Sequence, residues 1–146
     1  MEKNYLVNQP VSTEIQNQLL VESNAVHVGA QVSFIGCVRA DDIDKKQVTG
    51  IEYSAYPEMV NKEFDKIIVE IKSEFDDVHT VLIRHAIGLV KVGENAMVVT
   101  VAAGHRNQVY DALQKTVNLI KERVPIWKKE IFEGDDYRWT DNRKLL

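Results

Sequence analysis

The stretch at residues 121–130, KERVPIWKKE, places three lysines and one arginine around a proline and a tryptophan. The chain as a whole has a formal net charge of -4. Between residues 105 and 129, six basic residues stand against two acidic ones, a local balance of +4 that leaves -8 for the rest. Cations held at one place bind small anions and stabilise negative charge that develops in a reaction. We therefore predict a confined anion site here, the alternative being an ordinary solvated charged face.

Helical periodicity before the proline indicates where the first lysine points. Five apolar residues fall within about 80° on a wheel of 100° per residue and define a buried stripe. They are Val109, Leu113, Val117, Ile120 and Val124. Lys121 lies about 80° from the centre of this stripe, where its stem can pack on apolar surface while the ammonium faces a groove. Lys115 lies almost opposite the stripe and is expected to be solvated.

The residues after the helix place a second lysine near the first. Pro125 ends the helix because its ring cannot follow a helical residue without strain, and the sequence IWKKEIF then resumes an extended alternation. Neighbouring residues of a strand point to opposite sides, so Lys128 and Glu130 share one side and Lys129 lies on the other. Two lysines, one from the helix end and one from the strand, can thus converge on one pocket.

Three further basic residues are candidates for the same anion site. Arg39 stands at the end of a predicted strand, and His105 with Arg106 would begin the last helix, whose N-terminal N–H groups attract anions. Each of the last two has a simpler alternative, since Arg106 can cap local carbonyl groups and His105 can be a structural histidine. Trp127 and Phe34 are predicted to be core or pocket wall.

Hydrophobic patterns predict the elements that carry these side chains. Helical spacing predicts helices over residues 13–22, 57–75 and about 105–124. Alternating apolar residues predict strands over residues 25–40, 48–56, 79–92 and 96–104. The last two strands would form a hairpin across Gly93-Glu94-Asn95, and the polar loop at 40–47 is expected to be mobile. No repeat or linker divides the chain, so we predict one domain over residues 1–146.

Composition excludes several classes of protein. With 146 residues, 45% of them hydrophobic, the chain can bury a core, and it contains no signal peptide or membrane-spanning run, so we expect a cytoplasmic protein. Its one cysteine, Cys37, excludes a disulfide framework, and four scattered histidines make no metal site. A sequence pI of about 5.6 argues against a general nucleic-acid binder.

Six short motifs together carry a family resemblance. They are FIGCVR (34–39), YPEM (56–59), RHAIG (84–88), VGE (92–94), GHR (104–106) and KERVPIWKKE (121–130). In this order and at these intervals, the sequence resembles the large, catalytic subunit of molybdopterin synthase. The likeness extends from about residue 5 to residue 140. The resemblance implies an α+β fold of the α/β hammerhead type, a mixed or antiparallel sheet packed with two main helices.

The resemblance also implies a reaction and partners. The family is a sulfurtransferase of molybdenum cofactor biosynthesis that adds two dithiolene sulfurs to cyclic pyranopterin monophosphate, or precursor Z, and so makes molybdopterin. The sulfur arrives as the C-terminal thiocarboxylate of a small ubiquitin-like subunit with a Gly-Gly tail. Large subunits form a central homodimer within a heterotetramer. No resident cofactor or metal is implied, because the pterin is substrate and product.

The resemblance assigns site residues by position. Lys121 and Lys128 match the lysines to which catalysis is attributed. The substrate-binding positions are Cys37, Val38, Arg39, His105, Arg106, Lys121, Lys128, Lys129 and Glu130. Cys37 is interpreted as a bystander whose backbone lines the pocket, since the family's sulfur comes on the partner. The competing hypothesis is a non-catalytic protein that binds a ubiquitin-like tail or a small phosphate ligand, and a nucleic-acid role comes third.

Overall fold

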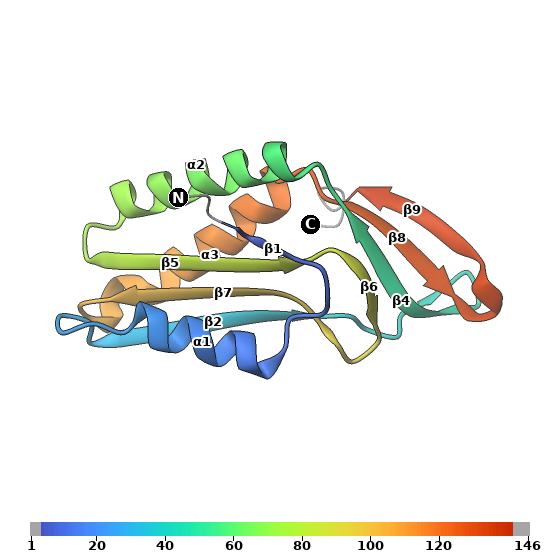
Figure 1. Cartoon of the computed structure of the whole chain (residues 1–146), viewed down its shortest axis with the longest axis horizontal. Coiled ribbons are helices and arrows are strands. Elements are labelled where there is room, and N and C mark those ends of the chain that lie inside the picture. The colour runs from blue at the N-terminus through green and yellow to red at the C-terminus, as the bar shows by residue number, and fades with distance from the viewer. Residues whose placement is uncertain (1–3, 142–146) are drawn as a thin grey trace.

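The computed structural model describes residues 4–141, which form two β-sheets and three α-helices (Figure 1). The sheet with more residues in its strands, called the larger sheet below, has four strands in the order β1-β5-β7-β2, with β1 parallel to β5 and the other pairs antiparallel. Its strands are β1 (Leu6–Val7), β2 (Ala30–Cys37), β5 (Val78–Ala86) and β7 (Asn95–Ala103). The expected α+β class with a mixed sheet is confirmed.

The smaller sheet extends from one end of the larger one (Figure 1). Its strands are β3 (Asp42–Ile43), β4 (Lys46–Ser54), β6 (Gly88–Lys91), β8 (Trp127–Phe132) and β9 (Tyr137–Asp141), with a short 3-10 helix, η1 (Glu133–Asp135), between the last two. The order is β3-β4-β8-β9, and β6 also pairs with β4. Since β6 follows β5 directly, the chain passes from the larger sheet to the smaller one at Ile87 and Gly88.

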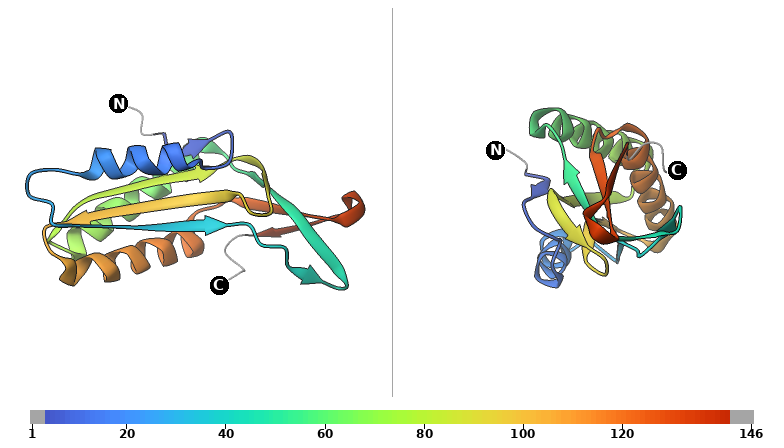
Figure 2. Two further views of the ribbon diagram at one scale, coloured as in Figure 1. Left: turned by 90° about the horizontal axis from the view of Figure 1, so that it is seen from below. Right: turned by 90° about the vertical axis from the view of Figure 1, so that its right-hand side faces the viewer.

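The three helices cover both faces of the larger sheet. They are α1 (Thr13–Ser23), α2 (Pro57–Glu74) and α3 (Arg106–Arg123). Figure 2 shows α1 on one face and α2 and α3 on the other. The two longer helices are the two main helices expected from the sequence. None of the helices described in residues 4–141 is long and apolar enough to cross a membrane.

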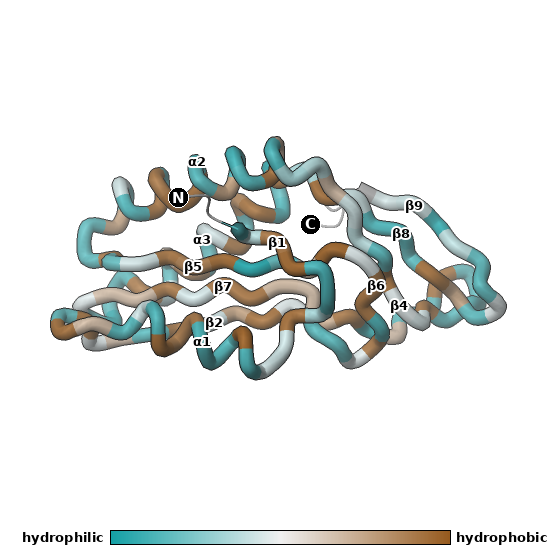
Figure 3. Tube along the Cα trace, in the orientation of Figure 1, coloured by the Kyte–Doolittle hydropathy of each residue, from teal (hydrophilic) through white to brown (hydrophobic). Residues whose placement is uncertain are grey.

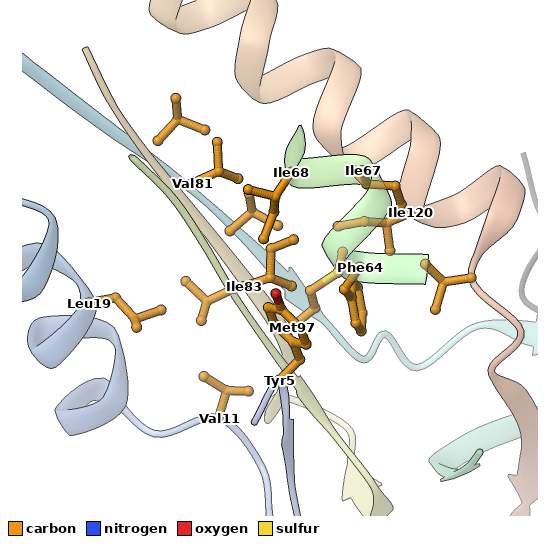
Figure 4. Packing of buried hydrophobic residues seen from close by; sticks show 14 of the residues in the cluster. Tyr5, Val11, Leu19, Phe64, Ile67, Ile68, Val81, Ile83, Met97 and Ile120 are labelled. Carbon is orange, nitrogen blue, oxygen red and sulfur yellow. The ribbon is translucent and has the colours of Figure 1, made fainter. Parts of the chain in front are cut away.

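The core fills the two layers between sheet and helices. Strand β7 is central and covered on both faces, which is why eight of its nine residues are buried. On one side, Val81 and Ile83 of β5 pack with Phe64 and Ile67 of α2, while Leu19 of α1 packs on the other side (Figure 4). Along α2, hydrophobic and hydrophilic residues alternate around the helix (Figure 3), as an amphipathic sequence requires.

Helix boundaries follow local signals in the sequence. The Ile15 N–H donates a hydrogen bond of 3.2 Å to the Ser12 hydroxyl, which caps α1. Pro57 occupies the first turn of α2, where its missing N–H has no helical partner to lose. The predicted stripe of α2 is buried at Val60, Phe64, Ile67, Ile68 and Ile71.

The face of α3 that packs on the sheet differs slightly from the predicted stripe. Val109 and Ile120 are fully buried as expected, but Leu113 and Val117 are only partly buried. Ala112 and Thr116 are buried in their place. Small residues at the contact let the helix lie close to the sheet, and the Thr116 hydroxyl is satisfied by donating to the Ala112 carbonyl at 2.7 Å.

The predicted strand over residues 25–40 is too long at both ends. Strand β2 begins only at Ala30, and Val26, 96% exposed, lies in a turn closed by the bond from the Val28 N–H to the Ala25 carbonyl. Apolar alternation alone could not show this turn. The predicted loop at 40–47 instead holds the β3–β4 hairpin, whose turn residues Asp44 and Lys45 have positive φ of 51° and 67°.

Phe64 provides a test of the packing between α2 and the sheet. Its side chain is fully buried, with its ring centroid 5.0 Å from that of Tyr5. We expect Phe64→Ala to lower the free energy of unfolding by about 3–5 kcal/mol, because it leaves a cavity. Urea denaturation followed by circular dichroism measures this. Val69→Ala, on the exposed face of the same helix, should change it by less than about 0.5 kcal/mol, and equal losses would contradict the packing described here.

Candidate active site

A cleft of about 600 Å³ lies where the larger sheet and α3 meet the smaller sheet. Its lining side chains come from both sheets, from α3 and from the segment after β2. The polar and charged ones are Cys37, Arg39, Asp41, Tyr53, His85, Lys121, Lys128, Glu130 and Arg138. Four of these nine side chains are lysines or arginines, so the cleft is a concentration of positive charge.

Lys121 enters the cleft from the last turn of α3. A cation is favourable at this end of a helix, because the unpaired carbonyl groups give it partial negative charge. The side chain is half-buried at the flank of the helix, as the helical wheel predicts. Burial lowers the pKa of Lys121 below its usual value, since the charged form loses contact with water.

Lys128 enters the cleft from β8 and is 9% exposed. Burial lowers the pKa of Lys128 to about 8, and the positive charges of Lys121 and Arg39 lower it as well. The nearby carboxylates of Glu130 and Asp41 act in the opposite direction. A lysine in this environment can bind an anion as a cation and can also release a proton near neutral pH.

Glu130 and Arg138 form a pair beside Lys128. The Arg138 guanidinium donates to the Glu130 carboxylate at 2.9 Å, and Glu130 is 6% exposed. The two residues face each other directly across the β8–β9 ladder. Arg138 was not among the predicted site residues. Its signal was the DDYRW sequence after β8, which can return as a paired strand and bring a basic residue opposite Glu130.

The segment at the end of β2 forms another wall of the cleft. The Cys37 thiol donates to the Asn95 side-chain oxygen at 3.1 Å, and the Val38 backbone is fixed by bonds with Glu94 and Gly93. Arg39 is mostly exposed and lies 3.3 Å from the Asp41 carboxylate. The structure thus brings Cys37, Val38, Arg39, Lys121, Lys128 and Glu130 together, as the sequence predicts.

Three predicted site residues do not line this cleft. Lys129 is on the opposite face of β8, where its ammonium lies 4.3 Å from the ring centroid of Tyr137. His105 and Arg106 are at the first turn of α3, about 24 Å along the helix from Lys121. The backbone N–H of His105 is not free to bind an anion, because it donates a hydrogen bond of 2.7 Å to the Asp77 carboxylate.

The predicted position of Trp127 is wrong. It was expected in the core or the pocket wall, but it is 45% exposed and lies away from the cleft, on the Lys129 side of β8. Phe34, predicted in the same way, does line the cleft. The alternation of side chains along β8 explains the exposure of Trp127. Because Lys128 and Glu130 point inward, the odd-numbered residues of this strand point outward. No three histidine, cysteine or acidic side chains within residues 4–141 are arranged to hold a metal ion.

His85 closes the buried side of the cleft. Its ring is 2% exposed and its Nδ1 lies 2.8 Å from the Ala86 carbonyl oxygen. Burial lowers the pKa of His85 to about 4, and the charges of Lys121 and Lys128 lower it further against the opposing backbone hydrogen bond. The imidazole is therefore neutral at pH 7.

Comparison with known proteins places the chain in a family. A sequence model described as MoaE protein matches residues 6–123. The chain belongs to the MoaE family. Molybdopterin synthase from Staphylococcus aureus, known from its crystal structure, has 33% sequence identity and a TM-score of 0.85, with 96% of this MoaE-family chain and 98% of that chain covered.

Two further relatives show how far this likeness reaches. The molybdopterin synthase catalytic subunit of Drosophila erecta is 34% identical over 142 residues, which are 97% of this chain but 38% of the relative. The chain therefore spans under two fifths of the length of that curated relative. A Helicobacter pylori complex of subunits 1 and 2 of molybdopterin-converting factor has a TM-score of 0.78 at 20% identity, with 92% of this chain and 88% of that chain covered, and shows the fold.

The effect of the Lys121 charge on Lys128 can be measured. We expect Lys121→Met to raise the pKa of Lys128, because a neighbouring cation that disfavours its charged form is removed. NMR titration of the protein with isotope-labelled lysine side chains reports this pKa. Lys115→Met is the matched control on the exposed face of α3. An unchanged Lys128 pKa in Lys121→Met would show that the two charges do not share one cleft.

His85 should make stability depend on pH. Its pKa is about 4 in the folded protein and near 6.5 when unfolded, so the unfolded chain binds more protons between these values. Stability from this residue is present above pH 6.5 and is lost as pH falls, by about 2 kcal/mol between pH 7.5 and 5. Between pH 7.5 and 5, the free energy of unfolding of His85→Gln, measured by urea denaturation, should therefore fall by about 2 kcal/mol less than that of wild type. His79→Gln, exposed on the same strand, should behave as wild type, and a loss in His85→Gln equal to that of wild type would refute this assignment.

Proposed function

We propose that this chain is the catalytic subunit of a molybdopterin synthase. In this proposal it converts cyclic pyranopterin monophosphate to molybdopterin, using sulfur carried as the C-terminal thiocarboxylate of a small ubiquitin-like subunit. The observation that carries the proposal is the convergence of Lys121 and Lys128 with Arg39 on one cleft. Membership of the MoaE family and relatives named molybdopterin synthase support it.

The cationic cleft suits a reaction between two anions. The substrate phosphate and the partner thiocarboxylate repel each other with only about 1 kcal/mol at 4 Å in water, but with about 4 kcal/mol at an effective dielectric near 20. A half-buried site therefore needs fixed positive charge to bring them together. The lysines and arginines that line the cleft supply it without having to reorganise during the reaction.

The two lysines can divide the chemistry. Lys121, at the helix end, would stabilise the thiocarboxylate and the oxyanion that forms when the partner's thioester linkage to the pterin is hydrolysed. Lys128, whose pKa is lowered to about 8, would assist opening of the substrate ring by proton transfer. Arg39 would hold the substrate phosphate through its guanidinium. The reverse division between the lysines uses the same charges and is a variant of this proposal.

The partners in this proposal follow from the family. The Helicobacter pylori relative is described as a complex of two subunits, which supports a small partner subunit for this chain as well. The Gly-Gly tail of that subunit would enter the cleft, and two copies of this chain would form the centre of a heterotetramer in the cytoplasm. The pterin is substrate and product, so the proposal includes no resident cofactor.

The decisive experiment reconstitutes the reaction. The protein is mixed with thiocarboxylated small subunit and the pterin precursor, and dithiolene product is measured as its fluorescent oxidised derivative. We expect product with wild type and a loss of about 100-fold or more in Lys121→Ala, because a group that stabilises transition-state charge is removed.

Two controls separate catalysis from binding. Lys115→Ala removes an exposed lysine of the same helix and should retain wild-type turnover. Partner binding should persist in Lys121→Ala. If the wild-type protein binds the small subunit and the pterin but yields no product, the chain is a binding protein and the catalytic proposal is wrong.

A further inference from the structure

The ring of His85 is held so that only one of its nitrogens can meet a ligand. His85 lies near the end of β5, next to the point where the chain leaves the larger sheet. The Tyr53 ring packs against it edge-on, with centroids 5.0 Å apart and planes at 77°. Nδ1 lies 2.8 Å from the Ala86 carbonyl oxygen. A carbonyl oxygen can only accept, so Nδ1 carries the proton and, in the neutral ring, Nε2 carries a lone pair.

The free nitrogen, Nε2, reaches the cleft. Among residues 4–141, no group donates a hydrogen bond to it. Within residues 4–141, the side-chain oxygen of Asn61 is the one fully buried side-chain N or O atom without a hydrogen-bond partner. Nε2 has no partner either, so it is not fully buried. The small exposed part of His85 opens onto the cleft that the residue lines. Nε2 is therefore an acceptor without a protein partner at the cleft floor.

Such an acceptor is unusual in this cleft. The side chains of Lys121, Lys128 and Arg39 can only donate when charged. The carboxylates of Asp41 and Glu130 accept, but each is already bonded to an arginine. Among the side chains of residues 4–141 that line the cleft, a ligand thus finds many donors, and the uncharged acceptors without a protein partner are the Tyr53 hydroxyl and His85 Nε2.

We propose that His85 Nε2 accepts a hydrogen bond from an N–H or O–H group of the ligand, and so selects ligands that carry a donor beside their anionic group. This inference rests on the proposed function and deepens it: the donor would belong to the pyranopterin rings and not to the phosphate. A carboxylate at this place would also accept, but it would cancel positive charge that the anion needs. A neutral imidazole accepts without that cost, and burial, together with the nearby lysines, keeps it neutral.

The test compares two ligands on two matched variants. His85→Asn keeps a donor near the Nδ1 position but removes the cleft acceptor, whereas His85→Gln can place an amide oxygen near the Nε2 position. Calorimetry measures the Kd of inorganic pyrophosphate and of cyclic pyranopterin monophosphate. We expect His85→Asn to weaken pterin binding about tenfold and pyrophosphate binding by less than about twofold, and His85→Gln to recover most of the loss. His79→Gln is the exposed histidine control and should bind both as wild type.

Each other outcome is decisive. Equal weakening of both ligands, or no weakening in His85→Asn, would make His85 a structural residue and overturn the inference while leaving the proposed function intact. A wild-type protein that binds pyrophosphate but not the pterin would overturn the proposed function itself. Independently of folding in any variant, ¹⁵N NMR of the wild-type imidazole should show Nε2 unprotonated at pH 7 and shifted when the pterin binds. A protonated Nε2 in the free protein would also overturn the inference.

Discussion

The repulsion between Lys121 and Lys128 is the constraint on which the site depends. Burial and the charge of Lys121 both lower the pKa of Lys128, so the fold must hold the two side chains in one cleft against this cost. Only three residues separate the end of α3 from β8, and two of them, Val124 and Ile126, are buried in or beside the core. Pro125 stands between them and prevents the helix from continuing. The buried residues on either side of Pro125 thus fix where the two lysines lie, and neither lysine forms an ion pair with another side chain within residues 4–141.

The junction of the two sheets makes the rest of the cleft. Gly88, with φ of +95°, allows the chain to turn from β5 into β6 three residues after His85. The same junction brings Tyr53 of β4 against the His85 ring. The larger sheet is covered by helices on both faces and therefore serves as a rigid base for the site. The smaller sheet contributes Lys128, Glu130 and Arg138 from two adjacent strands.

Local sequence patterns predicted the features that depend on neighbouring residues, such as the direction of side chains along a strand. They did not predict the features that depend on pairing between distant strands. Strand alternation after Pro125 placed Lys128 inward and Lys129 outward, because a two-residue period needs no knowledge of the rest of the fold. Arg138 and His85 were missed because their positions depend on β9 returning to β8 and on β5 ending beside β4. The strand over 25–40 was extended too far since exposed valines, such as Val26, satisfy the same alternation as buried ones.

The carboxylates around Lys128 explain how an acidic chain can use so concentrated a basic site. With a pKa lowered to about 8, Lys128 can exchange a proton near neutral pH while most copies still carry charge. Glu130 and Asp41 raise this pKa against burial and the neighbouring cations. Without them the lysine would lose more of its charge and hold an anion less well. Because Glu130 also binds Arg138, one carboxylate preserves the charge of Lys128 and fixes the position of a second cation.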